Sequence, residues 1–244
     1  MTENSPTHVA PHSAVLFDAV GTLIHPEPSV AAAYHAAGLR HGSQLGLDEV
    51  HERFRAAFAA EEAFDAASGK LRTDEARELR RWRTIVSTTF GDVPSERHGG
   101  LFDDLWQQFA QPSSWRAFDD APPTVELLQS QGVVVAIGSN FDERLLPIIA
   151  ELLPSVPIDR VFPSSLVGYR KPAAEFFEHC LTRLGLTNRN QLLIVGDDAD
   201  NDFFGPRKLD FPAIFLDRRN RTPDLVPRIA TLHELLTSET SVEP

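Results

Sequence analysis

Four short apolar runs constrain the fold of this chain more tightly than any other feature of its sequence. They cover residues 14–19, 133–139, 192–197 and 212–217 and are rich in Val, Ile, Leu and Phe. Apolar runs this short are typical of strands that are buried on both faces of a sheet. Helical patterns over 141–153, 173–186 and 202–209 alternate with the last three runs. This order predicts a doubly wound α/β fold with a parallel sheet, and residues 160–162 predict one further short strand.

The segment between residues 27 and 115 has a different pattern and contains no strand-like run. Its apolar residues recur at steps of three and four, most clearly in LDEVHERFRAAFAAEEAFDAA, which places them on one face of a helix. Thr73 and Ser95 are expected at helix N-caps, and Gly69 and Gly91 where helices end. The segment therefore predicts a bundle of about four helices, because it is too long for an ordinary α/β connection.

These patterns divide the chain into two domains and two tails. We expect a core domain of residues 14–26 and 116–238, with a helical domain of residues 27–115 inserted after the first strand. A chain of 244 residues is long enough for both. Residues 1–13 predict a disordered tail and residues 239–244 a loose one, because neither carries an apolar pattern.

Charge and composition argue against several classes of partner. The formal net charge of −12 disfavours nucleic acid and anionic lipid, because an acidic surface repels phosphate. No run approaches the ~20 apolar residues of a membrane helix, and the first residues lack a secretory pattern. The single cysteine, Cys180, lies in a helical pattern and is expected in the core. We therefore expect a cytoplasmic protein with neither a membrane nor a nucleic-acid partner; the sequence says nothing of its oligomeric state.

Polar residues stand where the predicted strands end. Asp18 follows the first run, Ser139 and Asn140 the second, and Asp197 the run over 192–197, while Lys171 lies in the loop VGYRKP. Ligands of open α/β sheets bind beyond the carboxyl ends of the strands, so these side chains are expected to meet there. Two carboxylates at one site repel each other unless a cation lies between them, and Mg²⁺ prefers such oxygen ligands. The set suits phosphoryl transfer, in which positioning and charge neutralisation supply most of the catalysis.

Four segments carry a resemblance to a known family. FDAVGTL, IGSNFD, GYRKP and GDDADND resemble, in order and setting, the four motifs of the haloacid dehalogenase (HAD) superfamily. The long gap between the first two is similar to members with a helical cap domain inserted there, and the resemblance covers roughly residues 14 to 236. It implies a Rossmann-like core, a hydrolase with Mg²⁺ as cofactor, and a small anionic substrate, most simply a phosphorylated metabolite.

The resemblance also implies roles for individual residues. Asp18 would be the nucleophile that forms an aspartyl-phosphate, with Gly21 allowing the tight turn after it. Asp202 would support Lys171 or a metal-bound water. Asp18, Asp197 and the backbone carbonyl of Val20 would bind Mg²⁺. The phosphate would be held by Thr22, Ser139, Asn140 and Lys171, of which Ser139 and Lys171 would also act in catalysis.

Val20 departs from the motif of the phosphatases in this superfamily. They usually carry there an aspartate that protonates the leaving group and activates water, which a valine cannot do. A positioned general acid or base contributes about 10²–10⁴-fold in rate, or roughly 3–5 kcal/mol of barrier. We therefore expect phosphatase activity to be slow, or limited to good leaving groups, unless another acid serves; the nearby candidates are His25, Tyr34 and His35.

Three other activities stay open at this stage. A 2-haloacid dehalogenase would also lack an acid at Val20, but such relatives lack the metal-binding acid that Asp197 would supply. Phosphonate cleavage would need a lysine in the helical domain, where Lys70 is the only one. A catalytically weakened ligand-binding member would keep the site without turnover.

An arginine-rich helix surrounds Trp82 and contains Arg77, Arg80, Arg81 and Arg83. We expect these arginines to lie on a solvated helix face rather than to form an anion clamp.

Overall fold

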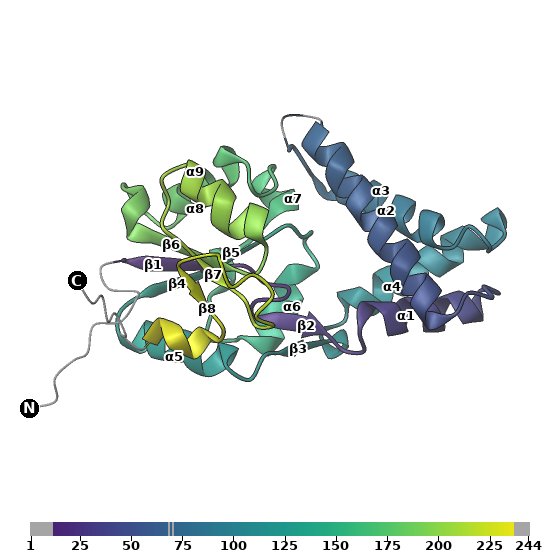
Figure 1. The fold of residues 1–244 in the computed structure, drawn as a ribbon, viewed down its shortest axis with the longest axis horizontal. Coiled ribbons are helices and arrows are strands. Elements are labelled where there is room, and N and C mark those ends of the chain that lie inside the picture. Colours follow the sequence, from purple (N-terminus) through teal and green to yellow (C-terminus); the bar gives the residue numbers. More distant parts are fainter. Residues whose placement is uncertain (1–11, 68, 70, 237–244) are drawn as a thin grey trace, which may run out of the picture.

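The computed structural model describes residues 12–67, 69 and 71–236. A sheet-containing core lies beside a group of long helices, and the chain crosses between the two parts twice (Figure 1). The core contains a six-stranded sheet in the order β5-β4-β1-β6-β7-β8, in which every neighbouring pair is parallel. The strands are β1 Ala14–Phe17, β4 Val134–Ser139, β5 Val161–Pro163, β6 Leu192–Gly196, β7 Ala213–Leu216 and β8 Arg228–Ile229. The predicted doubly wound α/β core is confirmed.

Alternate residues of each central strand pack on opposite faces of the sheet. On β1, Val15 and Phe17 join a cluster with helices α5 (Ala121–Ser130) and α6 (Leu145–Leu152). Leu16 joins a second cluster with helix α8 (Ala174–Arg183), which includes Phe176 and Cys180. Figure 1 shows α5 and α8 on opposite sides of the sheet. The period-2 alternation of strand side chains thus buries both faces, as the continuous apolar runs predict.

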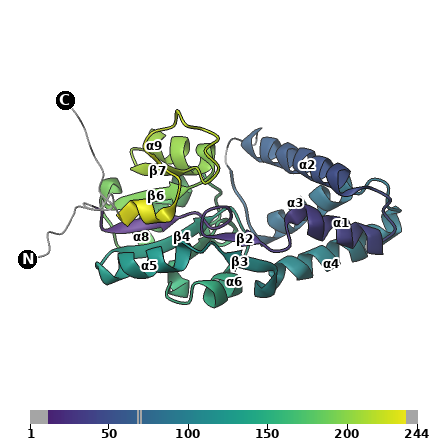
Figure 2. The ribbon, with the colours of Figure 1, turned by 60° about the horizontal axis from the view of Figure 1, so that its bottom comes forward.

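The second part consists of four long helices and a third apolar cluster. They are α1 Val30–Arg40, α2 Leu47–Ala67, α3 Glu75–Thr89 and α4 His98–Ala110, as the periodicity predicts. Both chain crossings lie in a short antiparallel pair, β2 (Ile24–Pro26) and β3 (Trp115–Ala117). Figure 2 shows this pair between the sheet and the helices. The remaining elements are α7 Ser164–Val167, α9 Gly205–Lys208, the π-helical turn Ala199–Phe204, and the 3₁₀ turns Ser95–Arg97, Pro112–Ser114, Ile158–Arg160, Arg189–Gln191 and Leu232–Leu236.

Three local predictions differ from the structure. Helix α3 is capped by Asp74, whose carboxylate accepts from Arg77 N–H, whereas the hydroxyl of Thr73 donates to Glu78. Ser95 lies inside a 3₁₀ turn and makes no cap hydrogen bond. The segment predicted as a helix over 202–209 begins earlier, as the π-helical turn, and continues into α9. The Thr73 hydroxyl thus has a tertiary partner, and the Asp198 carboxylate caps the π-helical turn; neither contact is encoded by periodicity alone.

The predicted tails lie mostly outside the described residues, as does Lys70. The exceptions are His12 and Ser13, which hydrogen bond to the backbone of Asn190 and Gln191. Within the described ranges, no helix combines the length and apolar character that crossing a bilayer requires.

The sheet–α8 interface supplies a test of the core. Phe176 is completely buried, so Phe176→Ala is expected to lower the free energy of unfolding by about 3–5 kcal/mol in urea denaturation. The control is Leu39→Ala, at a residue 54% exposed on α1, which should change that free energy by at most about 0.5 kcal/mol. Equal effects of the two substitutions would contradict this account of the core.

Candidate active site

A polar cleft of about 760 Å³ lies between the carboxyl ends of the central strands and the helices α2 and α3. Asp18 follows β1 directly, Ser139 ends β4 and Asp197 follows β6, so three strands deliver side chains to this cleft. Lys171, from the loop before α8, and Asp202, from the π-helical turn, complete its floor. The structure therefore brings together the side chains that the sequence predicts to meet.

The Lys171 ammonium lies between two carboxylates at the centre of the floor. Its Nζ is 2.7 Å from Oδ1 of Asp18 and 2.6 Å from Oδ1 of Asp202, and the side chain is almost fully buried. Burial by itself would lower the pKa of Lys171, but the two carboxylates more than compensate, so that its pKa is raised. Ser139 Oγ donates to the same Asp18 oxygen at 3.2 Å. Asp18 is thus fixed by a charge-assisted pair and a hydroxyl.

The three carboxylates of Asp18, Asp197 and Asp202 form one acidic cluster, with an oxygen of each within 4.8 Å of the others. Protein atoms crowding around Asp197, and then the charge of Asp18, raise the pKa of Asp197 to about 7. Burial raises the pKa of Asp202 to about 8, against the opposing effect of Lys171. The raised pKa values of Asp197 and Asp202 mean that the crowded carboxylates resist losing their protons together, and a divalent cation between them would stabilise their charged forms.

The donor set fits Mg²⁺. All the candidate ligands are oxygens, and Mg²⁺ is commonly bound by one or two carboxylates with its remaining positions left to water and phosphate. The carbonyl oxygen of Val20, the further ligand implied by the sequence, accepts no hydrogen bond from any described residue. That oxygen is therefore free to take part.

Thr22 and Asn140 have partners other than those the sequence predicts. The fully buried Thr22 hydroxyl accepts from the backbone N–H of Asp197 and donates to its carboxylate, both at 3.1 Å. Thr22 thus joins the loops after β1 and β6. Its expected contact with phosphate stays a prediction. The side chain of Asn140 hydrogen bonds to both backbone groups of Lys171, at 2.7 and 3.1 Å, and so positions the lysine. Only the backbone N–H of Asn140 stays free to meet a phosphoryl oxygen.

Two glycines allow the acidic loops to come this close. Gly21 has a φ of +93°, and a Cβ there would overlap the Asp197 carboxylate. A Cβ at Gly196 would overlap the Asp202 side chain in the same way. Gly21 was expected from the motif to allow a tight turn; its second function, leaving room for Asp197, is visible only in three dimensions.

The helical side of the cleft is held by buried ion pairs that the sequence analysis missed. Arg170 lies 2.8 Å from Glu62 of α2 and 2.8 Å from Glu78 of α3. Arg81 is 1% exposed and pairs with Glu62 and Asp65. Arg81 is therefore not on a solvated face, contrary to prediction, and it is not a free anion clamp either. The adjacency of Arg170 to Lys171 was the signal available in the sequence.

Val20 lies on the wall of the cleft, where it also borders a second, aromatic cavity. Of the suggested substitute acids, Tyr34 lines that cavity, and neither it nor His25 or His35 is among the residues that line the polar cleft. His25 instead packs on Phe118, with ring centroids 4.8 Å apart. Among the described residues none of the three therefore replaces the missing acid beside Asp18.

Comparisons with known proteins agree with this architecture. The family description "haloacid dehalogenase-like hydrolase" matches residues 12–208. The chain is 30% identical, over 84% of each sequence, to "Ribulose-1,5-bisphosphate 5-phosphatase" of Halopiger xanaduensis. It is 27% identical to human "Haloacid dehalogenase-like hydrolase domain-containing protein 3" over 78% of this chain and 76% of the other. The crystal structure of the defluorinating L-2-haloacid dehalogenase Rha0230 has the same fold, with a TM-score of 0.74, 18% identity and coverage of 97% and 98%.

The acidic cluster predicts that Mg²⁺ stabilises the protein. Mg²⁺ at roughly 100 times its Kd should raise the Tm by on the order of 5–10 °C, because it binds only the folded state. Asp197→Asn should abolish most of this shift in thermal melts with and without EDTA. Asp159→Asn, at an exposed carboxylate on a distant 3₁₀ turn, is the control and should retain it. An unchanged shift in Asp197→Asn would remove this residue from the metal site.

Proposed function

This chain belongs to the haloacid dehalogenase-like hydrolases, and from that membership we propose that it is a Mg²⁺-dependent phosphatase with Asp18 as its nucleophile. The single observation that carries the proposal is the arrangement around Asp18. Its carboxylate is held by Lys171 and Ser139 and lies in one cluster with Asp197 and Asp202. The phosphatase among its relatives supports the same reaction class.

Each residue of the cleft has its own role in the proposed phosphoryl transfer. Asp18 attacks phosphorus to form an aspartyl-phosphate, which water then hydrolyses. Lys171 and Ser139 hold Asp18 in position and lie beside the phosphoryl oxygens, which the backbone N–H of Asn140 also contacts. Asp18, Asp197 and the carbonyl of Val20 would bind Mg²⁺, which when bound neutralises the negative charge that gathers between carboxylates and phosphate. Asp202 keeps Lys171 charged and in place.

The dehalogenase alternative has one observation in its favour, the absence of an acid at Val20. The acidic cluster weighs against it, because the carboxyl groups of Asp197 and Asp202 beside Asp18 disfavour binding of a second carboxylate, that of the halo-acid. Halide release from 2-chloropropionate that EDTA does not affect would favour the dehalogenase.

Phosphonate cleavage would depend on Lys70, which lies outside the described residues. The cytoplasmic location and the absence of a nucleic-acid partner stay predictions from the sequence.

The nucleophile is tested by Asp18→Asn. An amide cannot form the phosphoryl intermediate, so turnover of 4-nitrophenyl phosphate with Mg²⁺ should fall by about 10³-fold or more. The fold should remain, as judged by circular dichroism. The control, Asp159→Asn, should keep wild-type turnover. EDTA should abolish turnover both in the wild type and in Asp159→Asn. Equal turnover by Asp18→Asn and wild type would refute the assignment.

The cost of Val20 is tested by Val20→Asp. A restored general acid should raise kcat for glycerol 1-phosphate by ten-fold or more, within the range of about 10²–10⁴-fold that such groups supply. The gain should be smaller for 4-nitrophenyl phosphate, because nitrophenolate leaves without a proton. Val20→Asn, which cannot donate a proton as an acid, is the matched control. A gain of the same size in Val20→Asn would show that proton transfer is not what the valine lacks.

A further inference from the structure

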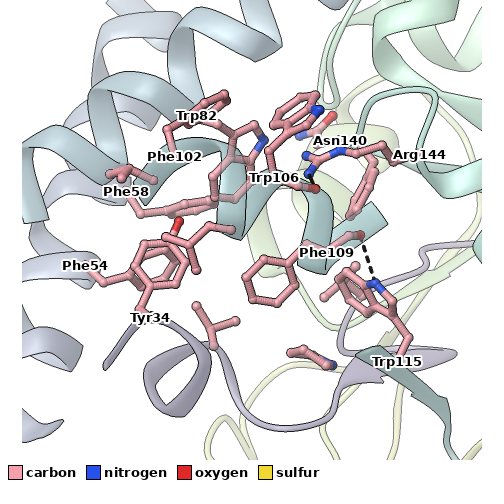
Figure 3. A pocket seen from close by; sticks show the side chains of 16 residues that line it. Tyr34, Phe54, Phe58, Trp82, Phe102, Trp106, Phe109, Trp115, Asn140 and Arg144 are labelled. Carbon is pink, nitrogen blue, oxygen red and sulfur yellow. Dashed lines mark hydrogen bonds between the residues drawn. The ribbon is translucent and has the colours of Figure 1, made fainter. Parts of the chain in front are cut away.

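An aromatic cavity of about 210 Å³ lies between the helical part and the core, next to the polar cleft. Nine aromatic rings line its wall. Figure 3 shows six of them, from α1, α2, α3, α4 and β3, facing one another: Tyr34, Phe58, Trp82, Trp106, Phe109 and Trp115. For scale, an apolar cavity of about 150 Å³ is large enough to bind benzene. This cavity is therefore large enough for one aromatic ring and its substituents, or for two fused rings.

The cavity and the catalytic cleft share a wall. Val20, Phe58, Trp82 and Asn140 line both spaces. Val20 follows Asp18 by two residues in the chain and lies on the wall between the two spaces. A substrate group that occupies the cavity next to Val20 is therefore attached close to the nucleophile. In the proposed phosphatase this is where the leaving group of a substrate extends away from the phosphate.

Among the described residues that line the cavity, none offers a free charge. The one charged side chain in this set, Arg144, donates to both carboxylate oxygens of the buried Asp142 at 2.7 Å and stacks on the Trp106 ring, 3.4 Å from the centroid. Its charge is thus already compensated. A phosphate or carboxylate at this position would lose its hydration without gaining a free cation, which favours a neutral occupant.

Tyr34 supplies one polar group. Its side chain is 2% exposed, and its hydroxyl, which points into the cavity in Figure 3, makes no hydrogen bond with any described residue. Burial raises the pKa of Tyr34, so the phenol is neutral and can donate. The hydroxyl therefore faces the cavity without a protein partner among the described residues, and an occupant with one polar atom would provide one.

We propose that this cavity binds the leaving group of the substrate and that this group is a neutral aromatic alcohol, so that the enzyme hydrolyses aryl phosphate monoesters. The proposal rests on the proposed function. A sugar phosphate fits the cavity poorly, because its many hydroxyls would face mainly aromatic rings, with few polar partners beyond the Tyr34 hydroxyl and the indole N–H groups of Trp82 and Trp106.

The chemistry of Val20 points to the same substrate class. A phenol has a pKa of about 10, whereas the value for water is about 15.7 and an aliphatic alcohol is similar. An Asp18 oxygen bonds to phosphorus while the bond from phosphorus to the aryl oxygen breaks, and the electron pair leaves on that oxygen as an aryloxide. Water then attacks the aspartyl-phosphate, the Asp18 carboxylate is released, and the proton lost by water goes to the aryloxide. An acid at position 20 is therefore least needed for this leaving group.

The cavity is tested by binding of 2-naphthol, followed through tryptophan fluorescence and calorimetry on the full chain. The half-buried Val30 lines the cavity, and Val30→Trp should fill it and weaken binding ten-fold or more. Val226→Trp, at a residue 70% exposed and away from the cavity, is the control and should bind as the wild type does. Tyr34→Phe, which removes only the hydroxyl, should weaken binding about two- to ten-fold. No binding by the wild type, or equal binding by Val30→Trp in its folded state, overturns the proposal.

Kinetics separates this proposal from the function on which it rests. With Mg²⁺, kcat/KM for 2-naphthyl phosphate should exceed that for glycerol 1-phosphate at least 100-fold, and Val30→Trp should lower that ratio at least ten-fold. Comparable turnover of both esters without 2-naphthol binding would contradict the aromatic cavity and leave the phosphatase standing. Binding of 2-naphthol without turnover of any phosphate ester would contradict the phosphatase and the aryl phosphate substrate, while the cavity would keep its aromatic ligand.

Discussion

The buried ammonium of Lys171 is the contact on which the rest of the site depends. It touches carboxylates from the loops after two different strands, Asp18 after β1 and Asp202 after β6. A charge that is so completely removed from water is tolerated only with close partners, and the same holds for both carboxylates. The side chain of Asn140 fixes the backbone of the lysine from a third strand end. The strands are therefore coupled at the point where the chemistry occurs.

The same loop also reaches the helical part of the molecule. Arg170 extends to Glu62 and Glu78 on α2 and α3, while the next residue, Lys171, extends to the catalytic floor. Two consecutive residues thus contact the helical side of the cleft and the nucleophile, Asp18, from one segment of backbone. This loop therefore makes charge-assisted contacts with both the helical part and the catalytic floor.

Sequence reasoning reached the fold because the relevant signals are local. Apolar runs set the strands, three- and four-residue spacing set the helices, and strand ends placed Asp18, Ser139 and Asp197 at one edge. It did not reach side-chain partners distant in sequence. Thr22 bonds to Asp197, which lies 175 positions away, and nothing in either motif indicates that contact. The aromatic cavity was missed for the same reason, since each of its rings is indistinguishable in sequence from an ordinary core residue.

Acid quenching of the enzyme during turnover of 2-naphthyl phosphate with Mg²⁺, followed by peptide mass spectrometry, asks whether Asp18 carries the phosphoryl group. We expect the mass of one phosphoryl group to be added to the peptide that contains Asp18, and no added mass when EDTA is present during the reaction. Product formation with the added mass on another residue would show that Asp18 is not the nucleophile. So would product formation with no added mass under conditions in which hydrolysis of the intermediate limits the rate.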